Sequence, residues 1–377
     1  MILIARGKLI QSVLGITPQL LRPEIELLLC CSHNKLEPEV VNKIQILVEK
    51  DLDWQWIIIM AKQQKMLPLL LRNLSYIECT PMPSKLWQYV QTKVRSITLY
   101  NLSLTSTLVN LLPQLEAHGI EAIPYKGSTL AQAAYGDLAL REFVDIDLLV
   151  SEQDFASIGG VLSHLGYQMG TLSFPWAQNY VHRRTQINLD VHRNLTQPYF
   201  PFRLDFQALW QRKQPMQLMG HTIYHLAPED LLVVLCVQAA KDAHHHQKEL
   251  SKVCDLAQLI RAHPNLNWEQ VLARASAWGG KKLVLFALCL THQLFEISLP
   301  SIVEQKIQSD LVVQLYAQLV ERHILSEEDV YSSRGKLGMI LRGLMLLESP
   351  LLPSNSNQQI FGQTLERLKQ SFKRVKV

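Results

Sequence analysis

The chain has 377 residues, of which 48% are hydrophobic and 19% are charged. This length allows about two domains with cores of their own, and the composition excludes an intrinsically disordered chain. The formal charge of +4 is too small to favour a nucleic-acid partner, although it leaves one possible. The best apolar run, 283–290, is less than half of the ~18 residues that cross a bilayer. None of the six cysteines forms a C-x-x-C pair, which indicates reduced thiols. We therefore expect a cytoplasmic protein without membrane segments.

Residues 1–118 are predicted to form an N-terminal helical region, because their apolar residues recur with helical spacing. Pro68 must kink or end the third of its helices, and Gly119 is placed like the glycine that closes a helix. The expected helices span 24–31, 39–49, 54–72 and 84–118.

The periodicity changes after Gly119, and residues 119–226 are predicted to form a compact α/β unit. Its strands are expected at 120–125, 143–150, 186–192 and 222–225, and its helices at 128–135 and 152–165. Residues 227–377 return to a helical pattern and are predicted to form a C-terminal helical domain. Its helices are expected at 228–243, 248–262, 268–277, 281–295, 302–323 and 358–376, with a loop at 349–357. The predicted fold class is α+β, with a mixed sheet between two helical regions.

Acidic residues occur on two of the predicted strands. Asp145 and Asp147 are two apart, so both side chains leave the same face of their strand. Asp190 lies on another strand, on the face opposite to the apolar Leu189 and Val191. Two carboxylates on a buried strand are costly unless a cation balances them, and oxygen ligands suit Mg²⁺ or Mn²⁺. In two-metal phosphoryl transfer the ions sit ~3.5–4 Å apart and stabilise the attacking and leaving oxygens. The sequence therefore predicts Asp145, Asp147 and Asp190 as catalytic metal ligands.

A turn suited to phosphate precedes these acids. Lys126, Gly127 and Ser128 follow the first strand and open a helix, whose free N–H groups attract phosphate. Arg141 lies close in sequence and could balance the charge of a triphosphate. Lys241 could reach the same ligand from the C-terminal helical domain.

The run from Tyr125 to Val150 resembles the signature of nucleotidyltransferases of the DNA polymerase β-like superfold, and most closely that of a bacterial branch. The resemblance covers about residues 105–262, and Asp190 stands where glutamate is common. It implies metal ligation by the three acids and triphosphate binding by the turn. The shared elements are Lys126-Gly127, Tyr135, Arg141, Asp145-Ile146-Asp147 and Leu189-Asp190-Val191-His192.

Simpler interpretations stay open for several residues. Asp190 could be an ordinary solvent-facing strand residue, and His192 could hydrogen-bond to Asp190 or only pack. Arg141 could pair with a neighbouring surface acid. The run 244–246, three consecutive histidines, cannot share one helical face, so a solvated helix end is favoured over a metal site.

Together these features predict a metal-dependent nucleotidyltransferase. It would move a nucleoside monophosphate from ATP, or another nucleoside triphosphate, to a hydroxyl group and release pyrophosphate. The acceptor could be a small molecule, a peptide or a protein. The alternatives are a toxin-like transferase acting on tRNA and an inactive module that binds a nucleotide or a partner.

Overall fold

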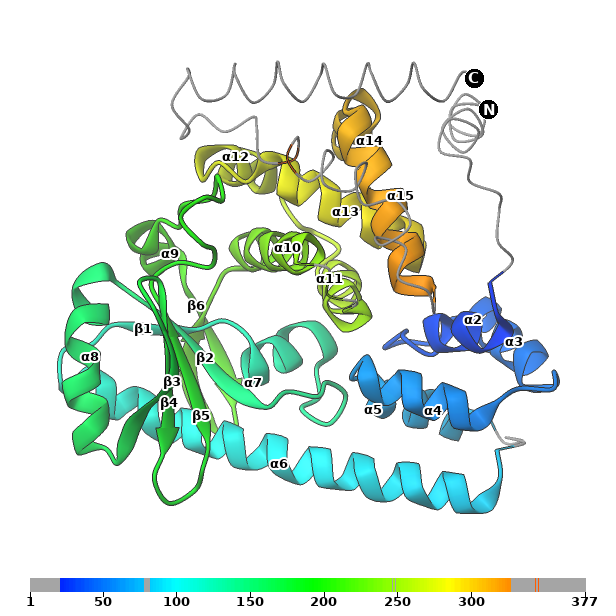
Figure 1. The fold of residues 1–377 in the computed structure, drawn as a ribbon, viewed down its shortest axis with the longest axis horizontal. Helices are drawn as coiled ribbons and strands as arrows, with labels where there is room; N and C mark the ends of the chain where they lie inside the picture. Colours follow the sequence, from blue (N-terminus) through cyan, green and yellow to red (C-terminus); the bar gives the residue numbers. More distant parts are fainter. Residues whose placement is uncertain are drawn as a thin grey trace.

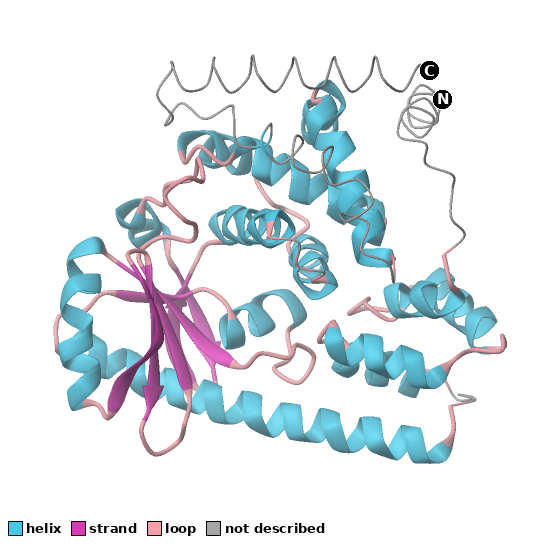
Figure 2. Ribbon diagram, in the orientation of Figure 1, coloured by secondary structure: helices cyan, strands magenta, loops and turns pink. Residues whose placement is uncertain are grey.

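The computed structural model of the protein describes residues 21–77, 82–245, 247, 249–326, 343 and 345. In this part of the chain, helices surround one five-stranded mixed sheet and a separate two-stranded sheet, and the strands gather at one end of the molecule (Figures 1 and 2). The predicted α+β fold class is confirmed. No helix among the described residues combines the length and apolar character that a bilayer span requires. The predicted helix at 358–376 and loop at 349–357 lie outside the described residues.

Short helices form the N-terminal part of the fold. Asp53 begins the third of them by accepting a 2.9 Å hydrogen bond from the backbone N–H of Trp56. Pro68 lies in the first turn of the fourth, which confirms that it breaks the pattern predicted for 54–72. These helices are α2 (Pro23–Cys30), α3 (Pro38–Val48), α4 (Trp54–Gln63) and α5 (Leu67–Tyr76).

The longest described helix is α6 (Ser84–Ala117), which has 34 residues. It ends just before Gly119, whose positive φ of 74° confirms the predicted closing glycine. Most of its buried residues lie in the second half, from Asn101 onward, where it packs against the sheet. In Figure 1 it runs from the N-terminal helices to the sheet, so it connects the two parts of the fold.

The large sheet has the strand order β1-β2-β5-β4-β3. Strands β2 and β5 pair in parallel, and every other pair in this sheet is antiparallel. The prediction missed β3 and β4, because Gly170 interrupts the alternation of apolar residues there. It also missed β6 and helix α9 (Phe206–Arg212). The strands of the large sheet are β1 (Ala122–Pro124), β2 (Asp145–Val150), β3 (Tyr167–Phe174), β4 (Ala177–His182) and β5 (Asn188–His192). The small sheet pairs β6 (Gln214–Leu218) with β7 (His221–His225).

The two faces of the large sheet differ in chemistry. On one face, apolar side chains such as Ile146, Leu148 and Val191 pack against α8 (Glu152–His164) and form a buried cluster. The opposite face carries the acids and faces the short helix α7 (Gly127–Leu130) and the C-terminal helices (Figure 1). This division follows from the alternation of side chains along each strand.

The C-terminal helices share a hydrophobic core with the N-terminal helices. The single helix predicted for 302–323 is wrong, because Asp310 separates two helices. Its side chain accepts hydrogen bonds of 3.0 and 3.1 Å from the backbone N–H groups of Val312 and Val313 and so begins a new helix. The helices are α10 (Pro228–His244), α11 (Leu250–Ala262), α12 (Trp268–Ala277), α13 (Lys281–Phe295), α14 (Ser301–Ser309) and α15 (Leu311–Leu325).

The cap of α4 gives a test of local stability. We expect Asp53→Ala to lower the free energy of unfolding by about 1 kcal/mol, because the N–H of Trp56 loses its acceptor. Urea unfolding followed by circular dichroism measures the change. Asp51→Ala, at an exposed position just before the cap, is the matched control, and an equal loss in both variants would contradict the capping role.

Candidate active site

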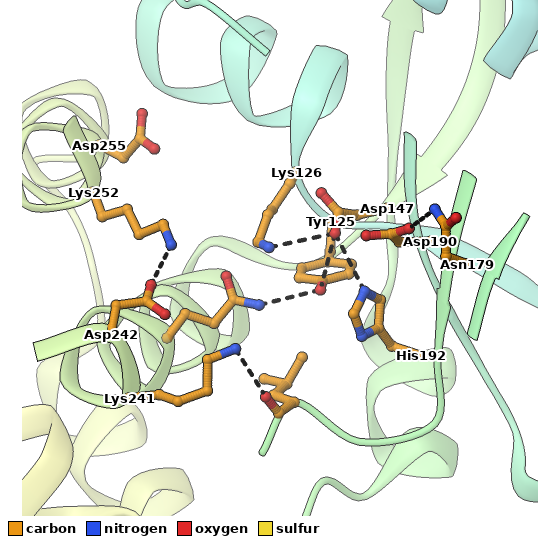
Figure 3. A network of polar contacts seen from close by, with 12 residues as sticks. Tyr125, Lys126, Asp147, Asn179, Asp190, His192, Lys241, Asp242, Lys252 and Asp255 are labelled. Carbon is orange, nitrogen blue, oxygen red and sulfur yellow. Dashed lines mark hydrogen bonds and ion pairs between the residues drawn. The ribbon is translucent and has the colours of Figure 1, made fainter. Parts of the chain in front are cut away.

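The parallel pairing of β2 and β5 brings the acidic residues together. Asp147 lies directly opposite Asp190 in the register, and Asp145 lies opposite Asn188. Paired residues of neighbouring strands project from the same face, so Asp145, Asp147 and Asp190 all leave the polar face of the sheet. Figure 3 shows Asp147 and Asp190 side by side.

Polar contacts converge on one carboxylate oxygen of Asp147, a residue that is only 6% exposed. Lys126 Nζ and His192 Nε2 each lie 3.3 Å from Oδ1, and the hydroxyl of Tyr125 donates to the same oxygen at 3.4 Å. Burial by itself raises the pKa of this carboxyl, but Lys126 and then His192 lower it well below its ordinary value. Asp147 is therefore held as a carboxylate.

Asp190, Asp147 and His192 form a compact group of potential ligands. One ligand atom from each side chain lies within 4.8 Å of the other two. Asp190 Oδ1 accepts a 2.6 Å hydrogen bond from Nδ2 of Asn179, which lies opposite it on β4. His192 Nε2 is buried and directed toward the carboxylate of Asp147. Two carboxylates and an imidazole nitrogen fit a divalent cation.

Asp145 is the more accessible acid of β2, and its carboxylate lies outside that compact group. Burial and then repulsion from Asp147 raise its pKa to about 6. A second cation would relieve that repulsion, so Asp145 and Asp147 fit a second position that adjoins the first.

The predicted phosphate turn lies beside the acids. Gly127 has a φ of +52°, and a Cβ added there would lie 3.4 Å from the backbone oxygen of Asp145, so the position favours glycine. Lys126 points across the turn toward Asp147. The Ser128 hydroxyl instead accepts a 3.0 Å hydrogen bond from Thr105 in the interior.

A polar pocket of about 250 Å³ lies over this face of the sheet. Its walls come from all three parts of the chain. The N-terminal helical region contributes Lys65, α10 contributes Lys241, and α11 contributes Lys252. Burial lowers the pKa of Lys241, and its ammonium lies 3.5 Å from the backbone oxygen of Leu195. Lys241 and His192 thus line the pocket, whereas His245 does not.

Arg141 also lines the pocket, but it has a protein partner. Its Nε and Nη2 donate to the two carboxylate oxygens of Asp255 at 2.8 and 2.9 Å. The hydroxyl of Tyr135 donates to the same carboxylate at 2.8 Å. This buried network joins the loop before β2 to α11, and it largely compensates the charge of Arg141.

Several residues of the site were not predicted. Asn179 lies on β4, a strand that the sequence pattern did not reveal. Tyr125 precedes the predicted turn, and the hydrogen bond that its hydroxyl accepts from Gln238 at 3.1 Å spans 113 positions of the chain. Lys65 and Lys252 lie in segments whose sequence pattern indicates a helix or a polar surface but no ligand site. Among these residues, only the proximity of Tyr125 to Lys126 gives a signal in the sequence.

Comparison with known proteins gives the family of the chain. Residues 50–296 match the model of a family described as uncharacterised nucleotidyltransferase, and the chain belongs to this nucleotidyltransferase family. Among solved structures, the chain is similar to an antigenic nucleotidyltransferase-like protein from Paracoccidioides brasiliensis, with a TM-score of 0.34 and 15% identity. The match covers 50% of this chain and 87% of that chain. No curated protein matches the sequence.

The Arg141–Asp255 pair gives a prediction about stability. Asp255→Asn should lower the free energy of unfolding by about 3 kcal/mol, because Arg141 stays buried without a full countercharge. Denaturant unfolding measures this change. Glu296→Gln removes the same charge from an exposed pair with Lys43 and should cost less than about 1 kcal/mol. Similar losses in both variants would show that the buried pair does not hold α11 in place.

Proposed function

We propose that the protein transfers a nucleoside monophosphate from a nucleoside triphosphate to a hydroxyl group and releases pyrophosphate. The observation that carries this proposal is the register of β2 and β5, which aligns Asp147 with Asp190 beside Asp145 on one face. The Lys126-Gly127 turn at the edge of the same pocket and the membership of the family support it.

Each acid has a distinct task in this proposal. Asp145 and Asp147 would hold one divalent cation, Mg²⁺ or Mn²⁺, and Asp147 and Asp190 would hold another. When bound, these ions would neutralise the phosphate oxygens and lower the pKa of the acceptor hydroxyl. Asn179 holds the carboxylate of Asp190 in place through its 2.6 Å hydrogen bond.

The cations that line the pocket would bind the phosphate groups. Lys126 lies at the turn and Lys241 approaches from α10, whereas Lys252 of α11 forms ion pairs with Asp242 and Glu249 and would orient this wall of the pocket (Figure 3). The compensated Arg141 would instead position the loop that leads into Asp145. Ser128 would contribute its backbone at the start of α7, because its hydroxyl is directed into the interior.

The reaction would be an in-line displacement at the α-phosphorus. A bond forms from the acceptor oxygen to phosphorus, the bond to the bridging oxygen breaks, and the hydroxyl proton passes to solvent. The protein contributes positioning and charge compensation more than covalent chemistry. ATP is the default donor. The mild net charge favours a small-molecule, peptide or protein acceptor over a nucleic acid.

The acids provide the first test of this function. We expect metal-dependent pyrophosphate release from at least one of the four common nucleoside triphosphates in the presence of an acceptor pool from a cell extract. Asp145→Asn and Asp190→Asn should each reduce the rate by about 100-fold or more, because the developing charge loses its stabilisation. Asp51→Asn, at an exposed position before α4, should leave the rate unchanged.

Binding measurements separate this function from its alternative. If the wild-type protein binds nucleotide as tightly as Asp190→Asn does, and releases no pyrophosphate with any acceptor pool, the protein is a binding module. Release that depends on added tRNA alone would support the tRNA-directed transferase instead.

Lys241 provides a test of triphosphate binding. Lys241→Met should raise the dissociation constant for a nucleoside triphosphate by about tenfold, since one charge-assisted contact is lost. The affinity for the nucleoside monophosphate should change much less, and isothermal titration calorimetry measures both constants. Lys62→Met, on the exposed surface of α4, is the control. Equal losses for the two nucleotides would place Lys241 away from the outer phosphates.

A further inference from the structure

The structure shows where the side chain of His192 points, which the sequence alone did not determine. It lies two residues after Asp190 on β5 and opposite Leu149, so its side chain leaves the same polar face as the acids. The edge contact between its ring and Tyr125, with centroids 5.8 Å apart and planes at 88°, limits rotation of the imidazole. The ring is thereby held with Nε2 directed toward Asp147 (Figure 3).

The nitrogen lies where a ligand of a cation is needed. His192 Nε2, one oxygen of Asp147 and one oxygen of Asp190 lie within 4.8 Å of one another. Atoms that bind one ion at about 2.1 Å from opposite sides are about twice that distance apart, so small side-chain rotations would close the group around an ion. The same nitrogen is buried and lies 3.3 Å from Oδ1 of Asp147.

We propose that His192 is the third protein ligand of the cation at Asp147 and Asp190, and that it makes this position prefer a first-row transition ion such as Mn²⁺ over Mg²⁺. The inference rests on the proposed function, because it concerns a cation of the same site. It adds a nitrogen ligand to a set of acids that by themselves would suit Mg²⁺.

The chemistry of the donor atoms supports this preference. Mg²⁺ strongly favours oxygen ligands and gives up its water reluctantly, whereas transition ions accept imidazole nitrogen readily. The adjoining position at Asp145 and Asp147 offers only carboxylate oxygens from β2. The two positions would therefore differ in the ion that each prefers.

The test measures metal binding by the full-length protein without nucleotide. Mn²⁺ is titrated against the wild type and against His192→Gln, which replaces the nitrogen donor with an amide oxygen. The bound ion is then examined by electron spin echo envelope modulation, which detects a ¹⁴N nucleus coordinated to Mn²⁺. His182→Gln is the matched control, because His182 lies on the neighbouring strand β4, contacts Tyr167 and does not line the pocket.

We expect ¹⁴N modulation in the wild type and in His182→Gln, and its loss in His192→Gln. The affinity for Mn²⁺ should fall by about tenfold or more in His192→Gln, while the affinity for Mg²⁺ changes little, so the preference for Mn²⁺ is lost. Circular dichroism of the metal-free variants verifies that both fold.

Two results would overturn the inference. One is wild-type protein that binds Mn²⁺ without ¹⁴N modulation, and the other is an unchanged ratio of Mn²⁺ to Mg²⁺ affinity in His192→Gln. If either result occurs while Asp190→Asn still abolishes pyrophosphate release, the ligand assignment fails and the proposed function stands. Wild-type protein that binds neither ion and releases no pyrophosphate contradicts both.

Discussion

The site depends on the parallel pairing of β2 with β5, which places carboxylates next to one another on a partly buried face. Removing like charges from water is unfavourable, and the elevated pKa of Asp145, about 6, reflects that cost. Around Asp147 the cost is offset by Lys126, His192 and the hydroxyl of Tyr125, which all approach the same oxygen. The protein thus maintains a concentration of negative charge that its own cations balance only in part.

The helices of the fold cover the other side of the sheet and form the wall that faces the acids. Helix α8 and the second half of α6 cover the apolar side of the sheet, and this packing holds the strands in place on the side opposite to the acids. Helices α10 and α11 form the facing wall, and Arg141, Tyr135 and Asp255 connect that wall to the loop before β2. A shared hydrophobic core joins these C-terminal helices to the N-terminal ones. The pocket therefore needs all three parts of the chain, although the acids come from the sheet alone.

Helices and acid-bearing strands were predictable because their signals are local. The repeat of apolar residues marked α6, α12 and α13, and the alternation on either side of Asp190 assigned that residue to the polar face. The hairpin of β3 and β4 gave no such signal, since Gly170 and a shift of register between Met169 and Ser173 disturb its alternation. Asn179 was missed for that reason. The helix predicted for 302–323 failed at Asp310, where a side-chain cap overrides a continuous apolar pattern.

The sequence alone determined that Asp145 and Asp147 share a face, that Asp190 lies on a strand with apolar neighbours, and that a glycine turn follows Lys126. Each of these statements depends on residues close together in the chain, where the spacing of side chains sets their direction. Only the tertiary structure decided that Asp147 and Asp190 are direct neighbours, that Arg141 binds Asp255, and that Ser128 is turned inward. Strand register and the docking of helices depend on pairings between distant residues, such as the 114 positions between Arg141 and Asp255, and no local pattern encodes such contacts.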